Sequence, residues 1–495
     1  MRPNPSVLAL AVVAFLPLAG IAQVQPAATT HTTTAPTHTT ALGRTRATAT
    51  SLYIEDVTVI DTETGKEAPH RTVKIRGGRI SAVIDSRTAK ASAGARIVKA
   101  SGKFLIPGLW DMHVHGNNQP WFADFFPLYL ANGVTGIREM FGPANAGQFR
   151  AELAARKVDA PRIYLGSPIV DGYPPVWPKS ISVKTPAEAR QAVDEQVRNG
   201  ADFIKVYSML SRDAYFAIID EANKKHIDVE GHVPRRISIW EATAAKQKSI
   251  EHLIGIGIGC SSREEELWPK VVAAKSAEEV ERLVVDASRS YDDDKCRRLF
   301  AEFKKNGSWP VPTLVVSRSF ASLNDPKFTR DERTKYFGGE ARRWLVADDD
   351  SRLQGKSDEY FKLQREYLAF DKRLVGELFR AGIPMLAGTD VGNPYCFPGF
   401  SLHDELAMRV ESGVSPLGAL QAATRNAALF MGASDKYGSV KPGMAADLVL
   451  LDADPLIDIH NTARISAVFL GGKEFDRAAL DGLLSQAEKT ASADR

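Results

Sequence analysis

Short stretches in which apolar and polar residues alternate lie at both ends of the chain. They read LYIEDVTVID, RTVKIRGGRISAVI, ARIVKAS and KFLIPG between Ser51 and Pro107, and GSVKPGMAADLVLLDAD and ISAVFLGGKEF from Gly438 onward. Alternation with a period of two, bounded by Gly and Asp turns, is typical of β-strands. We therefore predict one small β domain built from residues 51–107 and 435–480, with a long middle segment between its two parts.

The middle segment, residues 108–434, instead repeats a helix followed by a short apolar strand. TPAEARQAVDEQVRNGADFIKVY predicts a helix that begins at Pro186 and then a strand. The same order returns in SIWEATAAKQKSIEHL, where Ser238 and Glu241 have the spacing of a capping box, and in DKRLVGELFRAGIPMLAGTD, where Gly382 ends the helix. Helices that alternate with buried strands indicate parallel β/α units. The roughly 320 residues available favour an α/β fold closed as a (β/α)₈ TIM barrel.

The stretch from Cys260 to Tyr367 is charged, mostly helical and longer than one β/α step needs. We predict a loop-and-helix region over the mouth of the barrel, together with one strand in WPVPTLVV that ends at Thr313 or Leu314. Cys260 and Cys296 flank one helical stretch of this region and could form a disulfide, but geometry decides, so the sequence leaves their pairing open. Cys396 makes the number of cysteines odd, so at least one thiol is unpaired.

Segments at the two ends are expected to stand outside the folded domains. Residues 1–22 combine a positive Arg2, an apolar run and a small-residue end, which is the pattern of a signal peptide cleaved after Ala22; an uncleaved anchor is the alternative. Residues 23–50 are Thr-rich and almost free of large apolar residues, which predicts a disordered linker, and residues 481–495 are predicted as a flexible tail. We expect an exported protein, periplasmic or secreted, that leaves the membrane after cleavage.

Composition and charge narrow the class of partner. The chain has 495 residues, of which 44% are hydrophobic and 25% charged, as in an ordinary globular protein. Its formal net charge of +3 is small for this length and gives no reason to expect nucleic acid or an anionic membrane as partner. We expect a small-molecule substrate, while assembly into a homo-oligomer stays open.

Two histidines stand one residue apart directly after an apolar run, in LIPGLWDMHVHG. In an extended strand alternate side chains point to the same face, so His113 and His115 would project side by side, with Val114 pointing the other way. Imidazole is a common ligand of divalent ions, so this pair could begin a metal site. Such a site needs further ligands from elsewhere in the chain.

The other candidate ligands lie on the other predicted strands. Lys205 stands in DFIKVY, His232 in DVEGHV and His252 in SIEHL, and Asp390 ends IPMLAGTD. In a barrel of this type catalytic groups lie at the C-terminal ends of the strands. Each residue alone has an ordinary structural explanation, as a paired lysine, a core histidine or a helix N-cap. Together they would cost several kcal/mol to bury unless they are paired or bind metal, which favours a metal centre.

Six motifs resemble those of a known family: PGLWDMHVHG, GADFIKVY, EGHVP, SIEHL, AGTDVG and GSVKPGMAADLVLLDADP. In this order they resemble the amidohydrolase superfamily of metal-dependent hydrolases, and the resemblance covers the chain from about Ser51 to Asp476. SLHDELAMRVESGVSPLGALQAATRNAALFMG also resembles the branch that holds imidazolonepropionase-like enzymes and Xaa-Pro dipeptidases. The resemblance implies a TIM barrel with a small β-sandwich domain formed by the N- and C-terminal segments.

The resemblance also implies a ligand set for two divalent ions. Zinc is the metal that imidazole and carboxylate ligands favour, with manganese and cobalt as alternatives. A plain ammonium would repel two cations, whereas a lysine carboxylated by carbon dioxide is an anionic oxygen ligand suited to bridge them. One ion would be held by His113, His115 and Asp390, the second by His232 and His252, and the bridging carbamate would be on Lys205.

The expected chemistry is hydrolysis. A hydroxide held between the two ions would attack a polarised carbonyl carbon, and Asp390 would take its proton and pass it to the leaving group. Tyr207, two residues after Lys205 and on the same face, is a candidate donor to the substrate carbonyl. Trp177 and His403 are candidates for the wall of the substrate pocket. Three arginines are candidates for binding a substrate carboxylate: Arg138, Arg235 and Arg236.

We therefore predict a binuclear metal-dependent hydrolase that cleaves an amide bond of a small substrate such as a dipeptide or an N-acyl amino acid. Lys205 favours two ions over one. A mononuclear cyclic-amide hydrolase, a deaminase or a lactonase of the same superfamily is the alternative. A barrel that has lost catalysis and serves as a binding protein is a further hypothesis, which is disfavoured because every ligand-type residue is present.

Overall fold

The part of the chain that the computed structural model describes comprises residues 51–116, 119, 121–156, 158–346 and 355–494. The predicted signal peptide, residues 1–22, and the predicted linker, residues 23–50, lie outside it. Within the described part, no helix is both long enough and apolar enough to cross a membrane.

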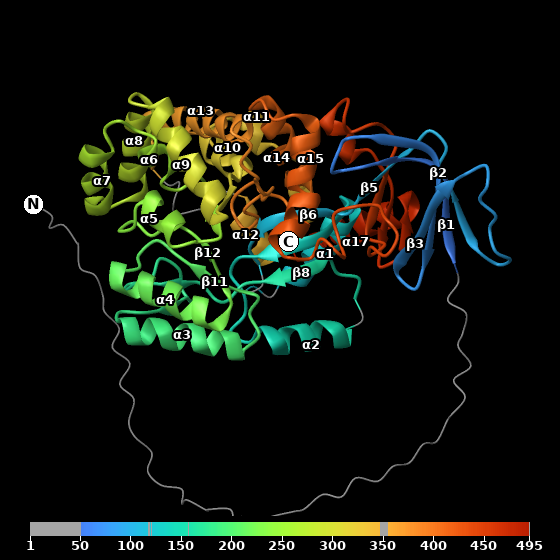
Figure 1. The fold of residues 1–495 in the computed structure, drawn as a ribbon, viewed down its shortest axis with the longest axis horizontal. Helices are drawn as coiled ribbons and strands as arrows, with labels where there is room; N and C mark the ends of the chain where they lie inside the picture. The colour runs from blue at the N-terminus through green and yellow to red at the C-terminus, as the bar shows by residue number, and fades with distance from the viewer. Residues whose placement is uncertain (1–50, 117–118, 120, 157, 347–354, 495) are drawn as a thin grey trace, which may run out of the picture. The chain divides into compact units, whose positions relative to one another are not determined.

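Strands from both ends of the chain pair in one eight-stranded sheet, as the alternating sequence pattern suggests (Figure 1). β5 and β15 join the two parts as an antiparallel pair in which Leu105 lies opposite Leu450. One core cluster contains fully buried side chains from both parts, among them Ile54, Leu448 and Phe469. The order of the strands is β17-β16-β15-β5-β1-β2-β3, with β4 paired to β1. The bounds are β1 Leu52–Ile60, β2 Glu67–Arg76, β3 Arg79–Asp85, β4 Arg96–Lys99, β5 Phe104–Pro107, β15 Leu448–Leu451, β16 Ile465–Leu470 and β17 Lys473–Asp476.

The middle of the chain forms parallel strands that are buried along almost their whole length. Burial on both faces explains why these strands read as continuous apolar runs rather than as alternating ones. One sheet has the order β6-β7-β8 and the other the order β10-β9-β11-β12-β13-β14. The bounds are β6 Leu109–Val114, β7 Val134–Glu139, β8 Arg162–Leu165, β9 Val170–Asp171, β10 Ile181–Ser182, β11 Phe203–Val206, β12 Asp228–Gly231, β13 Ser249–Glu251 and β14 Trp309–Val311.

Backbone hydrogen bonds link these two sheets at two places. Residues directly after β8 are joined to β11, and residues 386–391 lie between β14 and β6 and bond to both. The parallel strands therefore form a curled sheet whose first and last elements meet. The linking bonds include Ser167 N–H to Phe203 O (3.0 Å), Leu386 N–H to Pro310 O (3.1 Å) and Met112 N–H to Ala387 O (2.8 Å).

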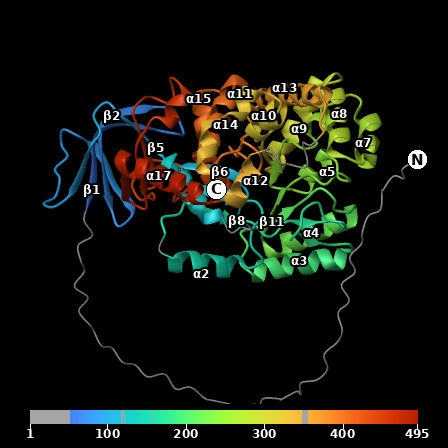
Figure 2. The ribbon, with the colours of Figure 1, turned by 180° about the vertical axis from the view of Figure 1, so that it is seen from behind.

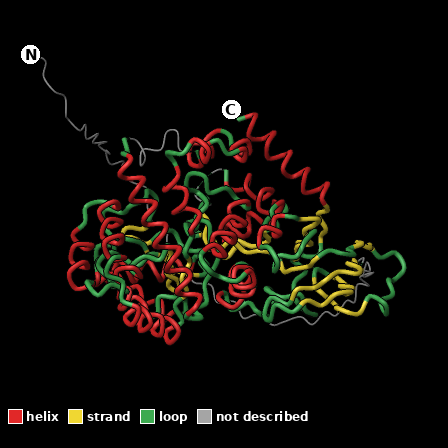
Figure 3. Tube along the Cα trace, turned by 90° about the horizontal axis from the view of Figure 1, so that it is seen from above, coloured by secondary structure: helices red, strands yellow, loops and turns green. Residues whose placement is uncertain are grey.

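Helices connect the parallel strands and pack against them (Figures 1–3). α3 and α4 lie side by side in the front and back views, and they are in contact. The largest apolar core contains strand residues such as Ile204 together with helix residues such as Ile218 and Leu374. The α-helices are α1 Phe126–Ala131, α2 Ala146–Arg156, α3 Pro186–Arg198, α4 Arg212–Lys225, α5 Ile239–Ala244, α6 Ile256–Gly259, α7 Glu264–Ala273, α8 Ala277–Ser288, α9 Asp293–Asn306, α10 Leu314–Ser322, α11 Pro326–Thr329, α12 Gly339–Leu345, α13 Asp358–Arg380, α14 Phe400–Glu411, α15 Pro416–Ala422, α16 Arg425–Phe430 and α17 Arg477–Ala493, and the 3₁₀ helices include η1 Phe122–Phe125, η2 Glu332–Tyr336 and η4 Ile459–Ala463.

The helix starts follow the sequence signals closely. α3 begins at Pro186, and the hydroxyl of Thr185 accepts a hydrogen bond from the Glu188 N–H at 3.2 Å. The predicted capping box of Ser238 and Glu241 is present at the start of α5. Each cap satisfies backbone donors that have no partner within the helix.

The described part of the charged region after Cys260 folds into α7 to α12 and the first part of α13, with the strand β14 between α9 and α10, in agreement with the mostly helical pattern. The pairing that the sequence left open is a disulfide between Cys260 and Cys296, whose Cα atoms lie 4.5 Å apart. This bond ties the residue after α6 to the first turn of α9 and encloses α7 and α8. Cys396 is a buried free thiol.

The prediction of a flexible tail over residues 481–495 is wrong for all but the end of that range. Residues up to Ala493 belong to α17, which packs against α1 and η2. Leu480, Ala487 and Ala491 are its buried residues. Their spacing of seven and four residues places them on one helical face, which the small size of alanine made easy to overlook.

Candidate metal centre

The centre is built first on the end of β6. His113 lies in β6 and His115 directly after it, and their Nε2 atoms are 3.2 Å apart. The Oδ1 atom of Asp390 lies 3.4 Å from His113 Nε2 and 3.0 Å from His115 Nε2. The structure thus brings together three residues from the two elements that close the curled sheet.

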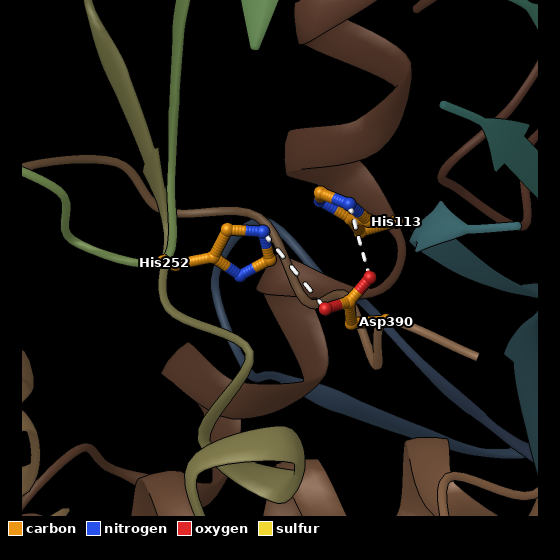
Figure 4. A group of neighbouring side chains, drawn as sticks. All are labelled: His113, His252 and Asp390. Carbon is orange, nitrogen blue, oxygen red and sulfur yellow. Dashed lines mark ion pairs between the residues drawn. The ribbon is translucent and has the colours of Figure 1, made fainter. Parts of the chain in front are cut away.

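His252 follows β13 and approaches the same carboxylate from the other side (Figure 4). Its Nε2 lies 3.9 Å from Asp390 Oδ2, and the ligand atoms of His113, His252 and Asp390 all lie within 4.8 Å of one another. His252 and Asp390 have φ angles of 55° and 58°, in the left-handed region that non-glycine residues seldom adopt. Backbone strain of this kind is concentrated at functional sites, where the surrounding structure stabilises it.

The partners of the Nδ1 atoms orient both rings toward the centre. His113 Nδ1 lies 2.6 Å from Glu251 Oε2, a carboxylate oxygen that can only accept, so Nδ1 carries the hydrogen. His252 Nδ1 lies 2.6 Å from Thr313 Oγ1, and that hydroxyl donates to Pro312 O at 2.7 Å, so His252 Nδ1 is again the donor. The Nε2 lone pairs therefore face Asp390, as in metal-ligating histidines.

His232 follows β12 and lies beside this group. Its ring centroid is 4.9 Å from that of His252, and the ring stacks on Tyr207 at 3.9 Å. The Nδ1 atom lies 3.0 Å from the Ser208 hydroxyl, so it too has a partner outside the centre.

Lys205 lies in β11 and is fully buried, and among the described residues its Nζ has no hydrogen-bond partner. Gly231 makes room for it, since a Cβ added there would lie 3.0 Å from Lys205 Cδ and 2.3 Å from Val206 O. Burial lowers the pKa of Lys205 to about 8. An ammonium without a partner in a buried site indicates that the site contains a further group when it functions.

The charges of the centre suit a divalent cation. Burial, followed by the charge of Lys205, lowers the pKa of His113 and His232 well below the usual value, and burial also lowers that of His252. Burial alone would raise the pKa of Asp390, but the nearby His252, His115 and Lys205 hold it below its usual value. Neutral imidazoles around an ionised carboxylate are the donor set that zinc and similar ions bind, so the residues fit the metal that the sequence predicts.

A buried ion-pair network lies next to the centre, and sequence reasoning missed it. Arg138 Nη1 donates to Glu230 Oε2 at 2.7 Å, and Nη2 donates to Glu251 Oε1 at 3.0 Å, with all three side chains fully buried. Glu251 therefore joins Arg138 to His113. The suggestion that Arg138 binds a substrate carboxylate is wrong, because its guanidinium is already paired within the sheet.

Asp111 is a second buried carboxyl that the sequence did not single out. It accepts from the Thr389 N–H at 3.0 Å, from the Thr389 hydroxyl at 2.5 Å and from the His113 N–H at 3.3 Å. Burial raises its pKa to about 7. These bonds fix the residue before Asp390 against β6, and so fix the two elements that carry the centre.

A cavity of about 460 Å³ opens onto the centre and is lined by His115, His232, His252 and Asp390. Tyr207 and Trp177 also line it, and Trp177 Nε1–H donates to Tyr207 Oη at 2.9 Å. The rest of the wall is mainly apolar, which is typical of small-molecule sites.

The structure does not bring His403 or Arg236 to this cavity. His403 lies in α14, where Nε2 donates to Asn132 O at 3.1 Å and Nδ1 lies 2.9 Å from Thr462 Oγ1. Burial lowers the pKa of His403 to about 4, so it is a neutral residue that ties α14 to α1 and η4. Arg235, in contrast, does line the cavity.

The fold and the site together define a class: an α/β protein with a histidine, lysine and aspartate centre at the ends of curled parallel strands. Residues 361–475 match the model of the amidohydrolase family. The ochratoxinase of Aspergillus niger is 26% identical over 440 residues, which cover 75% of this chain and 75% of that protein. Residues 361–475 thus resemble the amidohydrolase family, and the chain is similar to an ochratoxinase over three quarters of its length; both findings are consistent with a hydrolase that acts on carbon–nitrogen bonds.

Solved structures agree in fold. A bottromycin amidohydrolase superposes with a TM-score of 0.69 at 24% identity, covering 89% of this chain and 90% of that chain. A putative prolidase from Bifidobacterium longum superposes with a TM-score of 0.64 at 22% identity, covering 89% and 99%.

Proposed function

We propose that the chain is a binuclear metal-dependent hydrolase that cleaves the amide bond of a dipeptide or an N-acyl amino acid. The observation that carries the proposal is the convergence of His113, His115 and Asp390, with facing atoms 3.0–3.4 Å apart, at the mouth of an apolar cavity. The names of the similar proteins, an ochratoxinase and a putative prolidase, support action on amide-like substrates.

The proposal takes the curled sheet to be an eight-stranded barrel in which residues 386–391 serve as the eighth strand. The backbone bonds of this segment to both β14 and β6 support it. In such a barrel the active site lies at the C-terminal ends of the strands, where the candidate ligands are found. The eight-stranded sheet formed by both ends of the chain is then the smaller accompanying domain.

The proposed ligands divide between two ions. His113, His115 and Asp390 would hold one ion and His232 and His252 the other, and Lys205, carboxylated by carbon dioxide, would supply an anionic oxygen ligand. The partnerless, buried Nζ of Lys205 supports the carbamate, because carboxylation would replace an unpaired cation by an anionic oxygen ligand. Zinc is the metal proposed.

When bound, the ions would supply a nucleophile from water at neutral pH and polarise the scissile carbonyl. Asp390 would accept a proton at a carboxylate oxygen and deliver it to the leaving amine. Tyr207, whose Oη is held in place by the Trp177 N–H, donates to the substrate carbonyl oxygen. Arg235, at the wall of the cavity, pairs with a substrate carboxylate.

A mononuclear hydrolase of cyclic amides is a second candidate. Its support is that His113, His252 and Asp390 alone form a compact group within 4.8 Å, which is enough for one ion. The number of ions bound per chain separates the two candidates.

The test is reconstitution. Protein stripped by a chelator would be loaded with zinc and bicarbonate, its metal content measured, and its activity followed on a panel of dipeptides and N-acyl amino acids, with Asp390→Asn as the inactive control. We expect about two zinc ions per chain and cleavage by the wild type alone, with Lys205→Ala binding less metal. One ion per chain with cleavage of cyclic amides would favour the second candidate, and no metal bound would end the catalytic proposal.

We also propose that the protein is exported. The pattern of residues 1–22 supports this, and so does the Cys260–Cys296 disulfide, since such bonds persist in oxidising compartments.

A further inference from the structure

The cavity that opens onto the metal centre continues between α7, α8, α10 and α13. We call this part the helical annex. Its wall is mostly apolar and includes Trp268 and Val271 from α7, Val284 from α8 and Phe320 from α10. This apolar lining extends beyond the residues that surround the metal centre. It therefore indicates a binding site for a substrate side chain.

The helical annex is connected to the metal centre through α10. Thr313, which accepts the hydrogen bond of His252 Nδ1, immediately precedes α10. Ser317 and Phe320, about one and two turns further along this helix, line the cavity. A substrate with its scissile bond at the metal centre can therefore extend one side chain along α10 into the annex.

Glu281 interrupts the apolar wall of the annex. It lies in α8, and the Gln364 amide donates to its Oε2 at 2.5 Å. Among the described residues no Lys or Arg forms an ion pair with Glu281. Lys356 and Arg282, which are nearby, both pair with Glu278 instead, at 2.9 and 2.8 Å.

A carboxylate in such surroundings costs free energy unless a cation accompanies it. Burial indeed raises the pKa of Glu281 above its usual value. An apolar channel with a carboxylate in its wall matches a side chain that has a hydrocarbon stem and a cationic end.

We propose that the helical annex binds a substrate side chain of the lysine or arginine type, with the stem against Trp268, Val284 and Phe320 and the cation paired with Glu281. The inference rests on the proposed amide hydrolysis and names its substrate class. A purely apolar side chain of equal length would fill the same channel but leave Glu281 without a cationic partner.

The test compares substrates of matched shape. Dipeptides containing lysine would be compared with those containing norleucine, which has the same stem without the ammonium, placed on either side of the scissile bond. We expect kcat/KM for the lysine peptide to exceed that for the norleucine peptide by about tenfold or more, the scale of one charge-assisted hydrogen bond. Glu281→Gln, which keeps the shape and removes the charge, should abolish that preference, so that the ratio of the two kcat/KM values falls to about one. Glu265→Gln on α7 is the matched control, since Glu265 is exposed and outside the cavity wall.

A binding measurement separates this inference from the proposed function. The affinities of Nα-acetyl-lysine amide and Nα-acetyl-norleucine amide would be measured by calorimetry for the wild type and Glu281→Gln. If norleucine peptides are cleaved as well as lysine peptides, the inference is wrong and the proposed hydrolysis stands. If no peptide is cleaved, the proposed function fails. In that case, tighter binding of the lysine amide than of the norleucine amide, lost in Glu281→Gln, still supports a cation site in the helical annex. Equal binding of the two amides by the wild type overturns the inference.

Discussion

Glu251 is the residue on which the metal centre and the buried ion-pair network meet. It accepts from His113 Nδ1 with one oxygen and from Arg138 with both. Glu251→Gln would keep the size but replace one acceptor oxygen by a donor, so His113 could no longer be held by a charged acceptor. We expect a loss of roughly 10- to 100-fold in metal affinity, the usual effect of removing such a partner. Competition with a chromophoric chelator measures it.

The control for this prediction is Glu281→Gln, the same substitution at a carboxylate that lines the cavity and does not contact His113. It should retain wild-type metal affinity. Equal metal affinities for Glu251→Gln and the wild type would show that Glu251 only balances the charge of Arg138.

For single residues, the sequence identified candidate site residues better than it identified the side chains that they contact. The six candidate ligands were singled out because each lies in or directly after a predicted strand whose apolar run is visible in the sequence. Arg138 and Glu251 were missed as a pair because they are far apart in the chain, and only the folded sheet brings them together. The available signal was the presence of charged residues inside buried strands such as VTGIRE and SIE. His403 was misplaced because the sequence does not tell which helical face meets the cavity.

The positions of the helices α7 and α8 depend on the disulfide. The Cys260–Cys296 bond closes a segment with a sequence separation of 36 around them, and both helices line the cavity. Replacing both cysteines by alanine should lower the free energy of unfolding by about 3–4 kcal/mol if loop entropy dominates. Guanidinium unfolding measures this, and limited proteolysis should show faster cleavage between residues 260 and 296.

Reduction of the wild type provides the control. A phosphine reductant should reproduce both changes in the wild type and have no effect on the double variant. Identical unfolding midpoints for the oxidised wild type and the double variant would contradict the prediction.

The boundaries of helices and strands show where local sequence patterns are enough to predict the structure. Caps fix helix starts locally, so Pro186 and the Ser238–Glu241 box gave correct positions. Residues 386–391 are harder, because they bond to strands on both sides without being a regular strand themselves. The helical character of the region after Cys260 and a place over the mouth of the barrel were predicted, whereas which of its helices line the cavity depends on contacts between α8, α10 and α13 that no local pattern encodes.

At the scale of the whole molecule, the C-terminal segment contributes to two layers. β15 to β17 complete the sheet begun by the N-terminal strands, and α17 then returns to pack on α1 and η2 beside the barrel-like middle. The stability of the middle is therefore expected to depend on residues that the sequence suggested were a loose tail.

Two glycine substitutions test this dependence with opposite signs. Gly338 has an ordinary φ of −121°, but a Cβ added there would lie 2.2 Å from Ala491 O of α17. Gly338→Ala should therefore push α17 away and lower the free energy of unfolding by about 1–3 kcal/mol.

Gly482 lies within α17, and a Cβ added there meets nothing within 4 Å. Because alanine favours a helix over glycine, Gly482→Ala should raise the free energy of unfolding by about 0.5–1 kcal/mol. Unfolding of both variants in denaturant gives the two signs directly. A tail that is detached in solution would leave both variants as stable as the wild type, because neither a clash with α17 nor its helicity would then affect the global unfolding transition.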